Sequence, residues 1–274
     1  MQVSKSDGTH EPFDPKKLYA SLSHAGAAAD IAQSIVTDIE HDLYEGIPTH
    51  EIYAKAFARL RDHKHHVAAR YSLKRAVLEF GPSGFPFEAY LAELFRAEGC
   101  TDVIIDQIVQ GACVEHEVDV IYTKDGHRFY VEAKFHNALG FKTDLKTVLY
   151  VKARIDDIAA AKKDEQVRGL VATNTKFTSV AIQYATCQQL ELLSWDYPLS
   201  GNLHDRIEKA KLYPITALTS LSHREKTSLL ANKKVLCGDL SADTRALAEA
   251  GIHGAHADSV LAEAGALCVP GSAI

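Results

Sequence analysis

Three side chains in one short stretch have the types and spacing that phosphodiester hydrolysis requires. Asp119 falls in a strand-like run over residues 112–122, and Glu132 and Lys134 fall in a second run over 128–135. Residues two apart on a strand face the same way, so Glu132 and Lys134 project together, and Asp119 can face them from a neighbouring strand. Two carboxylates suit Mg²⁺, and a lysine beside them can orient water or stabilise the transition state.

The alternative interpretation is an ordinary ion pair on a solvated hairpin, because a glutamate two residues before a lysine is common. The places of Glu132 and Asp119 in their predicted strands argue against an ordinary ion pair. Glu132 directly follows the apolar residues 129–131, which places it at the end of a predicted central strand. Asp119 lies between two valines, where an unpaired charge would be costly to bury. Glu115 and Glu117 share the predicted face of Asp119 and stay open as competing ligands.

The surrounding sequence predicts an α/β core of roughly 115 residues that would position these side chains. A turn at residues 124–126 joins the two strands. The other predicted elements alternate between helix and strand. They are a helix at 87–98, a helix around 149–158, a buried strand at 169–173, a helix at 177–190 and a strand at 192–195.

Over roughly residues 84–196, the chain resembles the PD-(D/E)XK restriction-endonuclease superfamily and, within it, the Mrr-like nucleases. Four pieces carry the resemblance in order: residues 84–90, 117–120, 131–134 and 171–181. The resemblance implies that Asp119 and Glu132 bind a metal ion and that Lys134 is the catalytic lysine. It adds Glu88 as a further catalytic acid, with Glu93 as a nearby alternative. The sequence departs from the motif in one respect, since no proline precedes Asp119.

The beginning of the chain predicts a β-hairpin over residues 1–14 followed by four helices. Asp7 and Gly8 form a favoured tight-turn pair, and Asp14 followed by proline can cap a helix. The predicted helices run from 16 to 28, from about 31 to Gly46, from a cap at Thr49 onward, and from 67 to 80. The histidine-rich residues 61–66 are interpreted as a solvated connector between helices.

This segment resembles the ATP-cone domain, which controls ribonucleotide reductases and a related repressor. The resemblance implies an ATP or dATP pocket lined by Val3, Lys5, Glu11, Lys17 and Thr49. Lysines and helix N-termini suit a triphosphate, and the domain resemblance favours this role over the alternative that Lys5 and Lys17 are ordinary surface lysines. The chain has no Gly-rich phosphate loop followed by lysine, which favours nucleotide sensing over an ATP-driven motor.

The domain organisation predicted from these features has three parts. A Gly-Pro-Ser-Gly break at 81–84 separates an ATP-cone domain at 1–80 from a nuclease domain at 81–200. Residues 201–274 form a helical domain for packing or oligomerisation, or a DNA-binding helix pair. The expected fold is therefore multi-domain: an α+β ATP-cone, a mixed sheet flanked by helices, and an all-α segment.

Bulk composition limits the function classes. A net charge of −6 argues against indiscriminate coating of nucleic acid. The basic residues that follow the proposed site are Lys142, Lys146, Lys152 and Arg154. Lys142 and Lys146, four residues apart, would share a helix face that either contacts phosphates or is plain solvated surface. Apolar runs are too short to span a bilayer, no secretion signal opens the chain, and the five dispersed cysteines fit reduced thiols. The expected location is the cytoplasm.

The sequence thus predicts a nucleotide-regulated DNA endonuclease, dependent on Mg²⁺ or Mn²⁺, that acts in defence or DNA quality control. The expected partners are DNA, a nucleoside triphosphate and further copies of the chain, with no membrane. One alternative is a non-enzymatic regulator whose nuclease-like fold only grips DNA. Another is a nucleotide-binding assembly protein that makes no DNA contact.

Overall fold

The computed structural model describes residues 1–274 except 6–7, 82, 139, 164 and 269–274. The chain divides into two compact units. One unit combines Met1–Ala76 with Tyr213–Ile274, and the other is Val77–Leu212. The second unit is therefore inserted, in chain order, between the two segments of the first. The multi-domain architecture expected from the sequence is confirmed.

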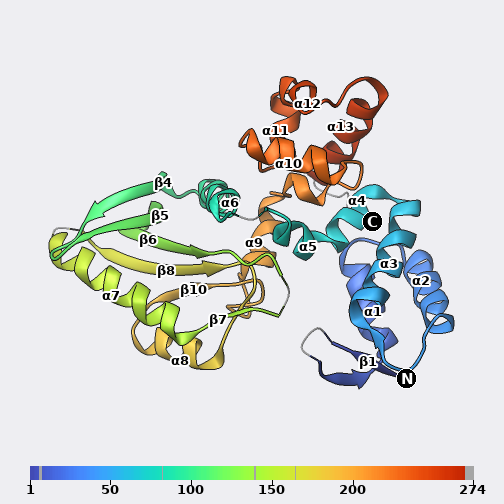
Figure 1. Ribbon diagram of the computed structural model, residues 1–274, viewed down its shortest axis with the longest axis horizontal. Helices are drawn as coiled ribbons and strands as arrows, with labels where there is room; N and C mark the ends of the chain where they lie inside the picture. The colour runs from blue at the N-terminus through green and yellow to red at the C-terminus, as the bar shows by residue number, and fades with distance from the viewer. Residues whose placement is uncertain (6–7, 82, 139, 164, 269–274) are drawn as a thin grey trace. The chain divides into compact units, whose positions relative to one another are not determined.

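A five-stranded mixed sheet forms the centre of the unit Val77–Leu212 (Figure 1). Its spatial order is β10-β8-β6-β5-β4. The pairs β4–β5 and β5–β6 are antiparallel, whereas β6–β8 and β8–β10 are parallel. The strands are β4 (Thr101–Gln110), β5 (Glu115–Lys124), β6 (His127–Lys134), β8 (Val167–Thr173) and β10 (Glu191–Leu193).

Helices cover both faces of this sheet (Figure 1). On one side lie α7 (Leu145–Ala161) and α8 (Ser179–Cys187), and on the other lies α6 (Phe85–Ala97). The apolar stripe of α7 packs on the sheet through Val148, Val151, Ile155 and Ile158. On the α6 side, the ring of Phe95 packs at a tilt against Tyr122, with ring centroids 4.4 Å apart. Burial on both faces explains why β5, β6 and β8 read as nearly continuous apolar runs.

The edge strand β4 was not predicted from the sequence. Its residues are largely exposed, and Ile104 and Ile108 face solvent, so the alternation that marks a half-buried strand is missing. Asp102 and Asp106 have positive φ, and the register with β5 shifts near the start of the strand. A ten-residue strand with two such irregularities has no clear period-2 signature.

Two details after β6 differ from the predictions. Lys142 lies in the short strand β7 (Lys142–Thr143) and Lys146 lies in α7, so the predicted shared helix face is wrong. Phe177 belongs to β9 (Lys176–Phe177), which pairs in parallel with β7. Helix α8 therefore begins at Ser179, where the side chain of Thr178 caps it by accepting from the N–H of Ala181. In unit Val77–Leu212 a last helix, α9 (Leu203–Ala210), follows the sheet.

The N-terminal segment folds as the predicted hairpin, β1 (Gln2–Ser4) and β2 (His10–Pro12), followed by helices. The turn residue Asp7 lies outside the described residues. Asp14 caps α1 (Pro15–His24) as predicted, since its carboxylate accepts from the N–H groups of Lys16 and Lys17. An unpredicted third strand, β3 (Ile47–Pro48), pairs in parallel with β1 and makes a three-stranded sheet.

Several helix boundaries in this segment differ from the predictions. The second helix, α2 (Ala29–His41), ends before Gly46, and the predicted helix 67–80 is two helices, α4 (His65–Tyr71) and α5 (Leu73–Leu78). Residues 61–66 are no connector, because α3 (Thr49–His63) and α4 extend into them. Thr49 is the first residue of α3 and makes no side-chain cap.

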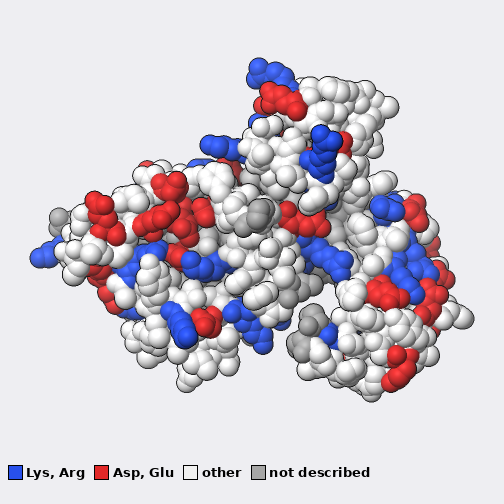
Figure 2. Space-filling model, viewed as in Figure 1, with Lys and Arg blue, Asp and Glu red and all other residues white. Residues whose placement is uncertain are grey.

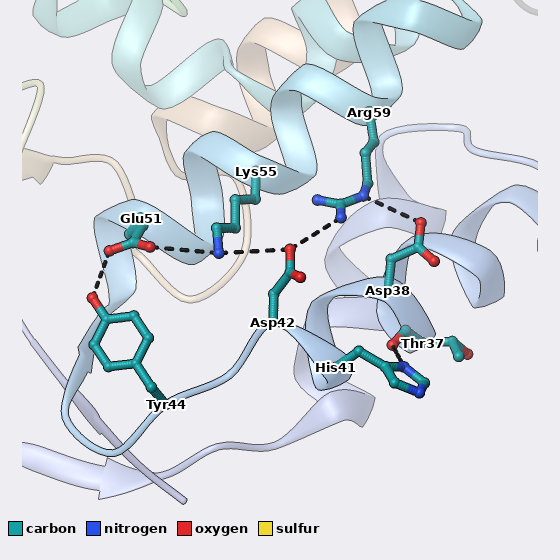
Figure 3. Close-up of polar contacts among 8 residues, drawn as sticks. All are labelled: Thr37, Asp38, His41, Asp42, Tyr44, Glu51, Lys55 and Arg59. Carbon is teal, nitrogen blue, oxygen red and sulfur yellow. Dashed lines mark hydrogen bonds and ion pairs between the residues drawn. The ribbon is translucent and has the colours of Figure 1, made fainter.

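An exposed polar network joins α2 to α3 (Figure 3). Arg59 binds Asp38 at 3.2 Å and Asp42 at 3.1 Å. Lys55 lies 3.6 Å from Asp42 and 3.5 Å from Glu51, which accepts a hydrogen bond from the Tyr44 hydroxyl. These contacts link the polar surfaces of two helices whose apolar sides form the core beneath them.

The C-terminal segment is helical and packs on the ATP-cone helices within the same unit. Helix α13 contacts α4 and α11. Buried Glu263 on α13 accepts hydrogen bonds from the backbone of Thr219 and Ser220, and the Thr219 hydroxyl contacts His65 of α4 at 2.5 Å. The helices are α10 (His223–Ala231), α11 (Cys237–Ala242), α12 (Arg245–Glu249) and α13 (Gly254–Cys268), preceded by a 3-10 turn at Ile215–Ala217.

The surface carries both signs of charge. Acidic and basic residues are interspersed over the face shown in Figure 2. All five cysteines are free thiols. Of the helices that the structure describes, none has the length and apolar character needed to cross a membrane.

Candidate functional site

Strands β5 and β6 part at the position where Asp119 and Glu132 face each other. The antiparallel pairing runs from Lys124–His127 to Val120–Val131, and the next opposed positions are Asp119 and Glu132. There the carboxylate of Asp119, rather than a backbone carbonyl, accepts the N–H of Ala133 at 2.6 Å. The first acid is therefore fixed beside the Glu-Ala-Lys segment, as the sequence predicts.

Glu132 is buried, with 4% of its surface exposed. One carboxylate oxygen binds the ammonium group of Lys134, and the other binds the guanidinium of Arg154 on α7. A buried carboxylate without such partners would be strongly destabilising. The two cations therefore explain how an acid can stand at the end of a central strand.

Glu88, at the start of α6, belongs to the same electrostatic cluster. Burial raises the pKa of Glu88 to about 7, with further contributions from Asp119, Asp106, Glu117 and Glu132. Burial also raises the pKa of Asp119 to about 6, and the charge of Glu132 adds to that rise. The carboxyl groups of Glu88 and Asp119 thus hold their protons more tightly than free side chains do.

The structure separates the competing acids. Glu93 pairs with Arg96, one turn later on the same helix, at 2.5 Å. Glu115 and Glu117 are exposed on β5, and only Glu117 contributes to the raised pKa of Glu88. The four residues singled out by the sequence, Glu88, Asp119, Glu132 and Lys134, are therefore the ones that come together.

The segment after Lys134 is held by a buried side chain. Asn174 is fully buried at the end of β8. Its amide oxygen accepts the N–H of His136 at 2.9 Å, and its amide nitrogen donates to the carbonyl of the same residue at 2.7 Å. The ring of His136 stacks on Phe141, and burial lowers its pKa. Asn174 thus fixes the chain that leaves the site.

A second histidine near the site, His116, lies close to the start of β5 and is tied to α7. His116 lies 2.8 Å from Asp157 of α7, and that carboxylate also accepts the N–H groups of Cys113 and Val114. The bond with His116 is the main reason why the pKa of Asp157 falls to about 2. Asp157 therefore fastens the β4–β5 turn to α7, and His116 serves that anchor.

Sequence reasoning missed Arg154 as a member of the cluster. It lies next in sequence to Ile155 of the apolar stripe of α7 and four residues after Tyr150, which it contacts. A basic residue beside an apolar helix stripe that packs on the strand of Glu132 was the available signal. It could be used only once the packing of α7 on β6 was known.

The donor set of this cluster fits a hard divalent cation. Among the described residues, no three or more His, Cys, Asp or Glu side chains form a ready-made metal cage. Mg²⁺ does not need one, because it keeps several waters and is commonly bound by one or two carboxylates. Burial is the main cause of the raised pKa values of Glu88 and Asp119, repulsion from neighbouring carboxylates adds to it, and a bound cation would relieve that repulsion.

The residues predicted for the nucleotide pocket lie on the small N-terminal sheet or in the segments next to it. Glu11 binds Lys5 at 2.6 Å and lies 3.7 Å from Lys17. Val3 pairs with Glu11 across the hairpin, but its side chain is buried in the core. Thr49 follows β3, which pairs with β1. A ligand here would meet the charged side chains directly and Val3 only through its backbone.

Three protein families match consecutive parts of the chain. The ATP cone domain family matches residues 1–77, and the restriction endonuclease family with the Mrr catalytic domain matches residues 82–197. The family described as AF1548-like, C-terminal, matches residues 213–268. These matches confirm the two resemblances seen in the sequence.

Individual relatives agree with this assignment. An uncharacterized protein of Archaeoglobus fulgidus is 38% identical over 158 residues, which are 57% of this chain and 88% of the relative. The crystal structure of the protein of unknown function AF1548 is similar at 34% identity and a TM-score of 0.57, covering 68% of this chain and 98% of that chain.

A repair endonuclease from Pyrococcus abyssi is a more distant likeness, at 24% identity and a TM-score of 0.31 over 38% of this chain and 45% of that one. Such a likeness supports no conclusion about activity. The first two relatives and the family matches do support an assignment. The chain belongs to the family of AF1548 and joins an ATP cone domain to an Mrr-type restriction endonuclease domain of the PD-(D/E)XK superfamily.

Proposed function

We propose that this protein is a nucleotide-regulated, metal-dependent DNA endonuclease. The observation that carries the proposal is the convergence of Asp119, Glu132 and Lys134, with Glu88 nearby, where β5 and β6 part. A module that only gripped DNA would gain little from acids facing phosphate, because like charges repel. The membership in a restriction-endonuclease family supports the same activity.

Each side chain has a role that its surroundings support. Asp119 and Glu132 would hold Mg²⁺ or Mn²⁺, which when bound supplies Lewis-acid chemistry by acidifying water and offsetting charge on the phosphate. Lys134 would orient the attacking water and donate to a phosphate oxygen. Glu88, with a pKa of about 7, can exchange a proton near neutral pH.

The first test is a cleavage assay on the full chain with supercoiled, linear and single-stranded DNA, and with RNA, in Mg²⁺, Mn²⁺ or EDTA. We expect DNA cleavage only with a divalent cation. Glu132→Ala and Lys134→Ala should lower the rate at least about 100-fold. Glu93→Ala, which removes an acid from the exposed side of the helix that carries Glu88, is the matched control and should keep the wild-type rate.

Two results would contradict this activity. Robust cleavage by both variants would show that Glu132 and Lys134 are not the catalytic residues. DNA binding without cleavage by the wild type would favour the non-enzymatic regulator. RNA cleavage without DNA cleavage would change the substrate class.

The cytoplasmic location and the homo-oligomer remain predictions from the sequence.

Nucleotide regulation is the second part of the proposal. The cluster of Lys5, Glu11 and Lys17 offers two cations to a triphosphate, and the ATP cone match supports ATP or dATP as the ligand. We expect either nucleotide to change the cleavage rate and Lys5→Ala or Lys17→Ala to weaken ATP binding about tenfold. Lys16→Ala, an exposed neighbour, is the matched control. Equal ATP affinity in all variants would place the nucleotide elsewhere.

A further inference from the structure

Arg154 makes contacts that a purely structural ion pair does not require. Its guanidinium binds buried Glu132 at one nitrogen and donates to the Tyr150 hydroxyl at 2.8 Å from another. Its central carbon lies 4.8 Å from the centre of the Tyr150 ring. Only 12% of the Arg154 side chain is exposed, whereas Tyr150 is 59% exposed. The guanidinium therefore packs against an exposed aromatic ring.

The hydrogen bonding of Arg154 is incomplete. Its Nε–H is buried and has no acceptor among the residues that the structure describes. A buried ion pair compensates for desolvation only when the remaining donors are also satisfied. This arrangement is therefore suited to a side chain that changes partners, and less suited to a permanent structural bond.

Arg154 also binds the carboxylate that the proposed metal ion needs. Lys134 takes one oxygen of Glu132 and Arg154 takes the other. Each oxygen of Glu132 already has a cationic partner, so a metal ion bound there competes with the positive charges of Lys134 and Arg154. Lys134 is adjacent in the same strand, whereas Arg154 reaches Glu132 from a separate helix and has an exposed aromatic ring beside it.

We propose that Arg154 is a phosphate-binding residue that stands in for the divalent cation on Glu132 and moves to a DNA phosphate when the cation binds. The guanidinium presents two parallel donors that match a phosphodiester, and Tyr150 gives it a stacking surface in both positions. This inference rests on the proposed nuclease function, and it adds a residue that the sequence motif does not contain.

The first experiment titrates Mn²⁺ into the full chain by calorimetry, without DNA. In Arg154→Ala the competing cation is gone, so we expect Mn²⁺ to bind at least about threefold more tightly than in the wild type. Lys152→Ala, which removes a lysine of the same helix that pairs with Asp156, is the matched control and should not change the affinity. Unchanged or weaker Mn²⁺ binding in Arg154→Ala would overturn the proposal.

The second experiment measures duplex DNA binding in Ca²⁺ across a salt series. We expect Arg154→Ala to weaken binding about tenfold and to reduce the slope of log affinity against log salt by about one, the signature of one lost phosphate contact. Tyr150→Phe, which keeps the ring and loses one acceptor, should weaken binding less. An unchanged slope in Arg154→Ala would also overturn the proposal.

Two controls keep the result interpretable. Arg154→Met keeps the apolar stem and loses the charge, and it replaces Arg154→Ala in both experiments if circular dichroism shows that the alanine variant is unfolded. Asp119→Ala separates the two hypotheses: if it binds Mn²⁺ as the wild type does, the proposed metal site itself is wrong. If Asp119→Ala loses Mn²⁺ while the Arg154 variants match the wild type, only the exchange of Arg154 is wrong.

Discussion

The protein contains two clusters of acids and bases that have similar residue types and opposite electrostatics. In the α2–α3 network, Arg59 lies between Asp38 and Asp42, and all three side chains are 30–53% exposed. In the β5–β6 cluster, Arg154 and Lys134 hold Glu132, whose side chain is 5% exposed. Hydrogen bonding to Arg59 lowers the pKa of Asp42, whereas burial raises the pKa of Asp119.

This difference separates an exposed ion-pair network from the cluster that we propose as the active site. The exposed carboxylates are stabilised as anions by neighbouring cations and by water, so they gain little from a further cation. The carboxyl groups of Asp119 and Glu88 are half-buried and less fully compensated, and burial raises their pKa values to about 6 and about 7. A site that binds a proton in place of a missing charge is also a site that can bind a metal ion.

Removal of Glu132 should have the largest effect on folding stability. Glu132→Ala removes the carboxylate that pairs with Lys134 and with the buried Arg154. We expect the free energy of unfolding to fall by about 3 kcal/mol or more. Trp195 is the only tryptophan and lies in the unit that contains the sheet, so urea unfolding followed by its fluorescence reports this loss. Glu115→Ala, an exposed acid on the same sheet, is the control. An equal effect of both variants would erase the contrast between the clusters.

Glu88 should give an intermediate effect that depends on pH. Its folded pKa of about 7 lies above the ordinary value of 4.5, so its contribution to stability is present at low pH and is lost as the pH rises through 7. Glu88→Gln removes that loss. We expect the variant to be about 1 kcal/mol more stable than wild type at pH 8, an amount reduced by solvent screening, and equal to it at pH 4.

The same Trp195 assay at the two pH values measures the difference. Glu93→Gln, on the same helix and paired at the surface, should follow the wild type at both. A gain that is larger at pH 4 than at pH 8 would reverse the sign and contradict the burial of Glu88 as its cause.

The exposed network should give the smallest effect. Arg59→Ala removes both of its ion pairs, and we expect the thermal midpoint measured by circular dichroism to fall by less than about 3 °C. In 1 M salt the difference should vanish, because charges at the surface are then screened within about 3 Å. Arg61→Ala on the same helix is the control. A large fall that persists in high salt would place this network with the buried cluster.

The sequence predicted which side chains of the proposed site come together better than it predicted the elements around them. Asp119, Glu132 and Lys134 are recognisable because strand alternation fixes which side chains share a face. The edge strand β4 escaped prediction because Asp102 and Asp106, both with positive φ, break its alternation. Arg154 escaped because its partner lies 22 positions away, and no local pattern reports which helix packs on which strand.

The same contrast holds for the ATP cone. The capped helix after Asp14 was predictable because a cap is a contact between near neighbours. The strand β3 and the break at Ser72 between α4 and α5 depend on tertiary packing. Contacts between near neighbours could therefore be predicted from the sequence, whereas contacts between distant segments could not.

The pairing of the first and last segments in one unit decides how this protein can be dissected. The Thr216 hydroxyl donates to the carbonyl of Ala76, and α13 packs against α4, so residues 213–268 complete the body that the nucleotide module begins. A fragment that stops near residue 80 would expose the surface of α4 that α13 covers in the whole chain. Nucleotide affinity is therefore best measured on a fragment that links 1–76 directly to 213–268, or on the whole chain.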